Sequence, residues 1–313
     1  MAKKIISIVT PVFNEEANIP YCYDTIKTLF EKELPGYDYE HVFCDNCSLD
    51  KSLNILKELA RNDKRVKVIA NSRNFGPNRS IFNGIISSTG DATIPYDCDM
   101  QDPADLIPKF IEKWEEGFEV VYGIRDKRRE NFAISAMRKL FYWLINMISH
   151  DFLPRDAGDF RLIDRRIREE LKKTVDNEPY FRGLVAVIGF NQTGINYNRL
   201  ERKHGKTSTN LFSLLNYAMN GIVKHSSAPL RLMTLVGFFF SVISILFAIV
   251  YLYFKIFHWH DYQIGFASLI ITLFVFFSVQ FLFFGLLGEY VSAIFTEVRK
   301  RPLVIERERV NFD

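Results

Sequence analysis

Two aspartates separated by one residue, Asp97 and Asp99, are the side chains in this sequence best suited to binding a metal ion. They directly follow the apolar stretch Ala92–Tyr96. In an extended chain, residues at positions i and i+2 point to the same side. Carboxylate oxygens suit Mg²⁺ or Mn²⁺, whose other ligands are commonly water and phosphate oxygens. Gln101 adds a neutral oxygen on that side. An isolated pair can be a simple acidic turn, so the surrounding elements decide between the two interpretations.

The elements around this pair alternate between strand-like and helix-like patterns. We predict strands at Ile5–Thr10, Tyr39–Cys44, Val66–Ala70, Ala92–Tyr96 and Phe118–Tyr122, and helices at Asn18–Lys32, Ser52–Arg61, Arg79–Ser87 and Ala104–Glu116. Alternation at this spacing predicts a parallel α/β sheet with helices on both faces.

Polar clusters follow the first four predicted strands, and ligands of such sheets bind beyond the carboxyl ends of the strands. The clusters are Asn14-Glu15-Glu16, Asp45-Asn46, Asn71–Asn74 and Asp97–Asp102. Glu15 and Asp45 lie at neighbouring strand ends, where their carboxylates could accept hydrogen bonds from a ligand. A second interpretation of Glu15 is an acid that complements the dipole of the following helix.

Two long uncharged runs dominate the C-terminal third of the chain. Leu232–Phe254 has 23 residues and Ile264–Leu287 has 24, and at 1.5 Å per residue either could span a bilayer core of about 30 Å. Their link carries Trp259 and Tyr262, which suit a membrane interface. We predict a transmembrane hairpin; the alternative is a pair of buried core helices.

The cations that flank this hairpin predict its orientation. Lys224, Arg231 and Arg299–Arg301 lie outside the two runs, whereas the link holds only Lys255. The positive-inside rule then places both ends in the cytoplasm. We expect residues 1–228 to form a cytoplasmic domain with an interfacial helix at about 208–225. Residues 229–289 would hold helices at about 232–254 and 264–287 in the inner (cytoplasmic) membrane, and residues 290–313 a cytoplasmic tail.

Composition narrows the partners. A net charge of +3 is too balanced to indicate a nucleic-acid partner.

The four cysteines include a CxxC at Cys44 and Cys47. It is either a redox pair or half a zinc site, or simply two small residues at the end of a buried strand, which we favour because no second ligand pair exists.

Six motifs in order resemble glycosyltransferase family 2. They are PVFNEEANI, CDNCSLDKS, NSRNFGPNRSIFNGI, GDATIPYDCDMQDP, AGDFRLIDR and RKHGKTS. The two uncharged runs and the tail LLGEYVSAIFTEVRKRP resemble its polyprenyl-phosphate glycosyltransferase branch, which holds bactoprenol glucosyltransferases and enzymes similar to dolichol-phosphate mannosyltransferase. The resemblance covers essentially the whole chain.

The resemblance implies a GT-A (Rossmann-like) nucleotide-sugar-binding domain. It implies that base and ribose lie among Pro11, Phe13, Glu15 and Asp45. Asp97 would contact ribose or metal, and Asp99 and Gln101 the metal and diphosphate. Arg202 and Lys206 would close over the diphosphate, Arg125, Ser135 and Arg138 would hold the acceptor phosphate, and Asp159 would be the catalytic aspartate.

The chain departs from the common family pattern at three places. Asn46 and Cys47 stand where many members have Asp and Gly, so the resemblance does not choose between UDP and GDP. Lys206 precedes Thr207, whereas the family usually has the lysine after the hydroxyl residue.

Asp159 has two possible roles in the expected reaction. It could be a general base, but a phosphate monoester has a second pKa near 6 and is mostly a dianion at neutral pH. It could instead orient the acceptor or stabilise positive charge on the sugar. A purely structural alternative is an ion pair with Arg161 or Arg165.

The expected activity is metal-dependent transfer of a hexose to a polyprenyl phosphate, with inversion at the anomeric carbon. The donor would be a nucleotide sugar of UDP-glucose or GDP-mannose type. We expect the protein to be a homo-oligomer in contact with membrane lipids. A processive polysaccharide synthase is disfavoured because no QxxRW motif is present. The rival from another class is a non-catalytic scaffold or flippase partner with a degenerate transferase domain. That rival predicts loss of the acidic residues, and all of them are present.

Overall fold

The computed structural model describes residues 3–125, 157–174, 179–198, 266–298 and 302–312, with scattered positions between 230 and 257. The chain divides into two compact units, described separately here. The first combines Met1–Asn146, Asp151–Thr209 and Lys300–Asp313, and the second Met147–His150 and Asn210–Arg299. Several sequence predictions lie outside the described residues: Ser135, Arg138, Arg202, Lys206 and the interfacial helix at 208–225.

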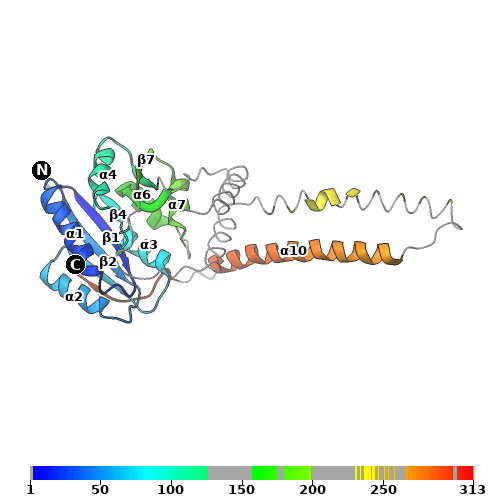
Figure 1. The fold of residues 1–313 in the computed structure, drawn as a ribbon, viewed down its shortest axis with the longest axis horizontal. Coiled ribbons are helices and arrows are strands. Elements are labelled where there is room, and N and C mark those ends of the chain that lie inside the picture. The colour runs from blue at the N-terminus through cyan, green and yellow to red at the C-terminus, as the bar shows by residue number, and fades with distance from the viewer. Residues whose placement is uncertain are drawn as a thin grey trace. The chain divides into compact units, whose positions relative to one another are not determined.

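The first unit is built on a mixed eight-stranded sheet (Figure 1). Its strands are β1 (Ile5–Val12), β2 (Asp38–Asp45), β3 (Val66–Asn71), β4 (Ala92–Pro95), β5 (Val120–Arg125), β6 (Ala157–Asp164), β7 (Gln192–Tyr197) and β8 (Glu306–Val310). They lie in the order β7-β5-β6-β4-β1-β2-β3-β8. Strands β1 to β4 are mutually parallel, β5 and β7 are parallel to each other, and β6 and β8 run antiparallel to their neighbours.

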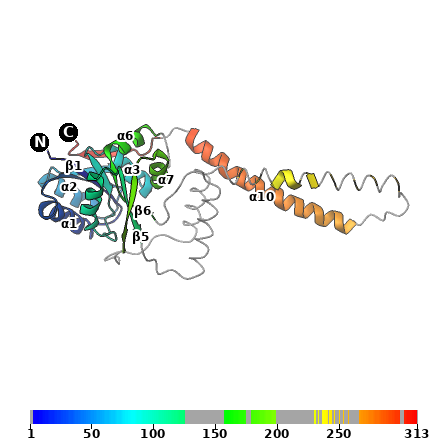
Figure 2. The ribbon, with the colours of Figure 1, turned by 90° about the horizontal axis from the view of Figure 1, so that it is seen from above.

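Helices cover both faces of this sheet, as Figure 2 shows from above. The helices are α1 (Ile19–Lys32), α2 (Ser52–Asn62), α3 (Pro77–Ser87), α4 (Leu106–Glu115), α6 (Arg165–Lys173) and α7 (Phe181–Ile188). One core packs α1, α2 and α4 against alternate residues of β1, such as Ile6 and Ile8. The other packs α3, α6 and α7 against the opposite face, where Val9 lies. Burial on both faces explains why the central strands are apolar almost throughout.

The nine strands and helices predicted from the sequence are confirmed, with ends that differ by a few residues. The prediction of a wholly parallel sheet is wrong at β6 and β8. Strand β6 pairs antiparallel with both β4 and β5. Strand β8 follows the uncharged runs in sequence and closes the edge beside β3. An antiparallel partner needs no crossover helix, so the helix–strand alternation gives no sign of either strand.

The described part of the second unit is chiefly α10 (Phe266–Val298), a helix of 33 residues. Among the described residues, no helix combines the length and the apolar character needed to cross a membrane, and the predicted two-helix hairpin is not found there.

Candidate active site

The predicted site residues gather at the carboxyl-end edge of the parallel strands. In the strand register Val12 lies beside Asp45, Asp45 beside Ala70, and Val9 beside Pro95. The loops that follow β1, β2, β3 and β4 therefore meet at one edge of the sheet. This confirms the expected placement of the four polar clusters.

Backbone-to-side-chain hydrogen bonds brace the loop after β1 against the loop after β2. Asn14 adopts a left-handed φ of 57°, and its Oδ1 accepts from the Leu49 N–H at 2.8 Å. The Asn14 N–H donates to Ser48 Oγ at 3.0 Å, and the Glu15 N–H donates to Ser52 Oγ at 3.0 Å. The two loops thus form one rigid rim.

Glu15 lies just before α1 rather than within its first turn. Its Oε2 accepts from Asn18 Nδ2 at 2.6 Å, and its carbonyl accepts from the Asn18 and Ile19 N–H groups. The Phe13 side chain, two residues before it at the carboxyl end of β1, is 43% exposed. A base or sugar ring could cover it.

Asp45 is buried at the end of β2. Burial raises the pKa of its carboxyl, and hydrogen bonds from Ser48 oppose that effect only in part. The Ser48 N–H lies 3.3 Å from each carboxylate oxygen, a long bond for a carboxylate. This carboxyl is therefore suited to a stronger partner such as a base N–H.

The side chain of Asn46 belongs to a buried network of amide hydrogen bonds. Its Oδ1 accepts from Asn71 Nδ2 at 3.1 Å and from the Phe75 N–H at 3.0 Å, while its Nδ2 donates to Asn74 Oδ1 at 2.8 Å. The network fixes the loop after β3. Asn46 thus determines the shape of the loop after β3. Any effect of Asn46 on base selectivity would come from the position of that loop.

Cys47 has a φ of 63°, the left-handed conformation that glycine adopts without strain. Glycine, the residue that the family resemblance leads one to expect at this position, would fit this conformation without strain. Cys44 is buried in β2. Among the described residues, no group of three His, Cys, Asp or Glu side chains is arranged so that it could hold a metal ion.

The loop after β4 carries the aspartate pair. Asp97 is half-buried and Asp99 is 7% exposed, while Cys98 between them is buried in the core. Met100 turns the chain with a φ of 51°, and the Gln101 N–H donates to Asp99 Oδ1 at 3.2 Å. The two carboxylates and Gln101 are the hard oxygen donors expected of a partial Mg²⁺ or Mn²⁺ shell, which phosphate and water oxygens would complete.

Asp102, at the end of this loop, joins the loop to the other half of the sheet. The Tyr197 hydroxyl donates to Asp102 Oδ1 at 2.5 Å, and Arg125 Nε donates to the Tyr197 oxygen at 3.0 Å. Arg125 Nη2 also lies 3.5 Å from Asp102 Oδ1. Arg125 therefore connects the aspartate loop to β5 and β7, in addition to the phosphate role that the resemblance implies.

Asp159 pairs with a residue that sequence reasoning missed. Arg182 at the start of α7 donates from Nε to Oδ1 at 2.7 Å and from Nη2 to Oδ2 at 2.6 Å. The structural alternative named Arg161 or Arg165 as the partner, and the structure assigns Arg182 instead. Desolvation raises the pKa of Asp159, but Arg182, Arg161 and Arg125 outweigh it and leave the pKa below its usual value.

The described site residues thus belong to one connected edge. Pro11, Phe13, Glu15 and Asp45 lie on the rim of β1 and β2, and Asp97, Asp99 and Gln101 on the loop after β4. Arg125 lies against Gly158, the residue before Asp159. Sequence reasoning included Asp102 only as a member of the acidic cluster Asp97–Asp102, without its partners, and it missed Tyr197 and Arg182.

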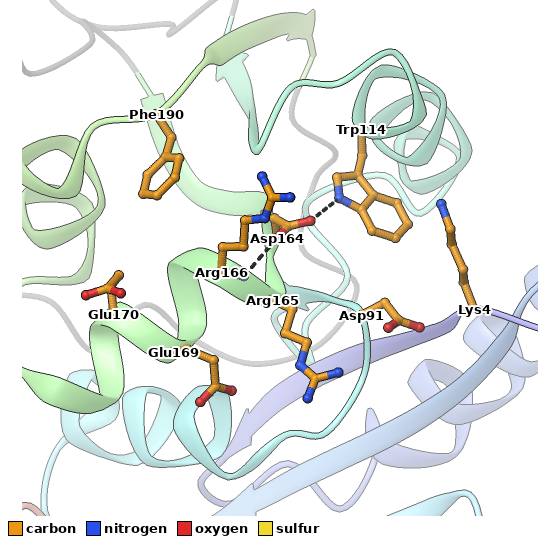
Figure 3. Close-up of a pocket in the computed structure, with 9 residues that line it drawn as sticks. All are labelled: Lys4, Asp91, Trp114, Asp164, Arg165, Arg166, Glu169, Glu170 and Phe190. Carbon is orange, nitrogen blue, oxygen red and sulfur yellow. Dashed lines mark hydrogen bonds between the residues drawn. The ribbon is translucent and has the colours of Figure 1, made fainter.

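A separate pocket of about 570 Å³ opens at the opposite, amino-end edge of the parallel strands (Figure 3). Its lining includes Lys4, Asp91, Trp114, Asp164 and Phe190. These polar groups already serve the fold: Trp114 Nε1 donates to Asp164 Oδ2 at 2.7 Å, and the Ile5 N–H donates to Asp91 Oδ2 at 2.9 Å. None of the predicted site residues lies here.

The sheet, its helices on both faces and the acidic loop at the carboxyl-end edge define an α/β domain of the nucleotide-sugar-binding class. The family model for glycosyl transferase family 2 matches residues 7–172, and the chain belongs to that family.

Similar proteins extend over nearly the whole chain. The uncharacterized glycosyltransferase YkcC of Bacillus subtilis is 40% identical over 96% of this chain and 92% of its own length. The bactoprenol glucosyl transferase of Shigella phage SfX is 34% identical over 97% of this chain and 99% of its own length. Among solved structures, glucosyl-3-phosphoglycerate synthase from Mycobacterium tuberculosis, crystallised with Mn²⁺, UDP and glucosyl-3-phosphoglycerate, is 18% identical, with a TM-score of 0.45 over 70% of this chain and 78% of that chain.

Proposed function

We propose that this protein transfers a hexose from a nucleotide-diphosphate sugar to a polyprenyl phosphate, with inversion at the anomeric carbon. One observation carries the proposal: Arg125 connects the donor-side aspartate loop, through Tyr197 and Asp102, with the Gly158–Asp159 segment. A transferase needs donor and acceptor groups fixed relative to each other, because alignment of the reacting atoms supplies much of the rate. The bactoprenol relatives support a polyprenyl phosphate as the acceptor.

The donor half of the proposal uses the rim of β1 and β2. Asp45 would accept from a base N–H or a ribose hydroxyl, and Glu15 from ribose. The exposed face of Phe13 would cover the nucleoside. Arg202 and Lys206 stay predictions from the family resemblance, since both lie outside the described residues.

Asp97, Asp99 and Gln101 would hold Mg²⁺ or Mn²⁺. When bound, the ion would neutralise charge that develops on the diphosphate leaving group. The support is chemical: two carboxylates and an amide oxygen within five residues are hard oxygen ligands of the kind that these ions prefer.

In the transfer step, an oxygen of the acceptor phosphate forms a bond to the anomeric carbon. The bond from that carbon to the nucleoside diphosphate breaks, and its electron pair leaves with the diphosphate. Attack from the opposite face inverts the configuration. The acceptor needs little deprotonation at neutral pH because its second pKa is near 6. We assign Asp159 the role of orienting the acceptor and stabilising positive charge on the sugar. We assign Arg125, Ser135 and Arg138 the role of binding the acceptor phosphate.

We further propose that the enzyme works at the cytoplasmic face of the inner membrane. The support comes from the sequence: two runs of 23 and 24 residues carry no charge, and most of the first lies outside the described residues. Among described residues of α10, Phe276, Phe281 and Phe284 are all more than half exposed. Side chains of this kind suit contact with lipid.

The test is an assay of the full-length protein in detergent or native membranes. It is incubated with undecaprenyl phosphate, Mg²⁺ or Mn²⁺ and a panel of UDP- and GDP-hexoses, and the lipid product is identified by mass. We expect one donor to give a polyprenyl-phosphate hexose that is lost on chelation of the metal. Donor binding without any lipid product would instead favour a scaffold or flippase partner with a degenerate site.

A further inference from the structure

The Asp159–Arg182 pair has a specific consequence for the reaction proposed above. We propose that Arg182 is a positioning residue for transfer: it fixes the Asp159 carboxylate in one orientation, so that Asp159 acts as a fixed negative charge rather than as a base. This inference rests on the proposed transferase function and on the described geometry around Asp159.

Asp159 and Arg182 form a bidentate ion pair. Both Asp159 oxygens are engaged by the same guanidinium, at 2.7 Å from Nε and 2.6 Å from Nη2. Such bonds restrict the rotation of the carboxylate about its own axis, which a single contact would leave possible. The two residues come from different elements, β6 and α7, so the pair also fixes α7 to the site.

Two further arginines surround the same short segment. Arg161 is buried and donates from Nη2 to the Gly158 carbonyl at 2.8 Å. A Cβ at Gly158 would lie 3.4 Å from Arg125 Nη2, so the guanidinium of Arg125 lies close to this glycine and would meet a side chain there. The charged groups that act on Asp159 are thus Arg182 on α7, Arg161 on β6 and Arg125 on β5.

Among the described residues, three arginines face two carboxylates here, Asp159 and Asp102, and this excess of positive charge suits an anionic acceptor. Desolvation raises the pKa of Asp159, but the arginines, led by Arg182, oppose it more strongly and leave the pKa below its usual value. A carboxylate with a lowered pKa is a weak base near neutral pH, and a phosphate dianion needs no strong one. The chemistry that remains for Asp159 is to orient its neighbours and to stabilise positive charge on the sugar.

The experiment compares Arg182→Met, Arg182→Lys and wild type in the lipid-product assay across pH. We expect Arg182→Met to lower kcat by about 10- to 100-fold, by analogy with the loss seen when a residue that orients a metal ligand is removed. Without Arg182, the pKa of Asp159 rises, so the acid limb of the kcat profile should move to higher pH. Arg182→Lys keeps the charge and should restore part of the rate, with an acid limb closer to that of wild type.

A double variant separates this role from a general effect on folding. If Arg182 acts through Asp159, adding Arg182→Met to Asp159→Asn should cost little more than Asp159→Asn alone. Arg166→Met is the matched control, because Arg166 lies on the neighbouring helix α6 with a side chain 75% exposed. That control should leave kcat and the pH profile unchanged.

The outcomes distinguish this inference from the proposed function. If wild type transfers and Arg182→Met keeps its kcat and acid limb, the inference is wrong while the function stands. Fully multiplicative losses in the double variant would also overturn it. If wild type makes no lipid product, the proposed function fails. An infrared titration of the carboxylates, assigned with Asp159→Asn, then tests the pair alone: Arg182→Met should raise the pKa of Asp159, and an unchanged pKa would overturn the pairing.

Discussion

At the scale of single residues, Asp99 is the most informative side chain of the aspartate loop. It is 7% exposed, one residue beyond the buried Cys98. We expect Asp99→Ala to lower kcat by at least about 100-fold, because removing a group that stabilises the charge of the leaving group costs on this order. Activity is measured in the lipid-product assay at saturating Mn²⁺.

The matched control for this change is Asp105→Ala. Asp105 is an exposed acid three residues past Asp102, and its side chain makes no capping bond to α4. It should keep wild-type activity. Wild-type activity in Asp99→Ala would remove Asp99 from the metal site.

Also at this scale, the structure explains only one of two neighbouring departures from the family pattern, at Asn46 and Cys47. Its left-handed φ of 63° is strained for a side chain with a Cβ, so glycine is the natural residue there. Asn46 beside it is a member of the amide network that holds the loop after β3. The amide network thus gives Asn46 a structural role, whereas nothing in the structure explains the cysteine at position 47.

At the scale of elements, the Glu40 side chain on β2 links β1, β3 and the turn that precedes β4. Its carboxylate, 4% exposed, accepts from Ser7 Oγ at 2.6 Å and from the Thr89 N–H at 2.6 Å, and pairs with Lys67 at 2.6 Å. Burial raises the pKa of Glu40, but these partners together leave it below the usual value of 4.5.

A lowered pKa means that Glu40 stabilises the fold above its unfolded pKa, and that this contribution is lost as pH falls through the folded value. Glu40→Gln should therefore cost about 3–5 kcal/mol at pH 7, as expected when one partner of a buried ion pair is removed. The loss should shrink below about pH 4 as the wild-type carboxylate is protonated. Thermal unfolding at several pH values measures it, with exposed Glu58→Gln as control; an equal loss at all pH values would contradict the prediction.

Strand β8, close to the end of the chain, pairs with β3 in the sheet of the first unit. Asn311 just beyond it donates from Nδ2 to the carbonyls of Ala60 at 2.7 Å and Val66 at 2.8 Å. The Ser72 N–H, at the end of β3, donates to the Ile305 carbonyl at 2.8 Å. The tail thus covers the sheet edge next to the loop that carries Asn74.

We expect Asn311→Ala to lower the free energy of unfolding by about 1–3 kcal/mol, because two buried carbonyls lose their donor. Arg307→Ala, on the exposed side of the same strand, should change it by less than about 0.5 kcal/mol. Thermal unfolding of both variants measures the difference. Equal stability would show that the tail contributes nothing to this edge.

At the scale of the whole molecule, the cation pattern predicts which side of the membrane each segment faces. We expect a cysteine introduced by His260→Cys to react with an impermeant maleimide added from outside the inner membrane, and not from the cytoplasmic side. Cys22, Cys44 and Cys98 are buried, so a Cys47→Gly background leaves little competing thiol. Labelling only from the cytoplasmic side would refute the proposed orientation.

The sequence by itself determined the order of strands and helices up to β5 and the clustering of polar residues at strand ends. Both follow from local periodicity, since apolar residues repeat every two positions in a strand and about every 3.6 in a helix. Asp97, Asp99 and Gln101 were found because they lie within four residues of one another behind a strand. The family resemblance was found in the same way, from short motifs in order.

Only the tertiary structure decided which distant residues become partners. Tyr197 meets Asp102 across 95 positions and Arg182 meets Asp159 across 23, and neither tyrosine nor arginine carries a periodic signal of its own. The antiparallel course of β6 and β8 was equally hidden, because strand direction depends on how the chain returns to the sheet. The aspartate loop could thus be predicted from adjacent residues, whereas the arginines that surround Asp159 come from separate elements and meet only when the sheet is assembled.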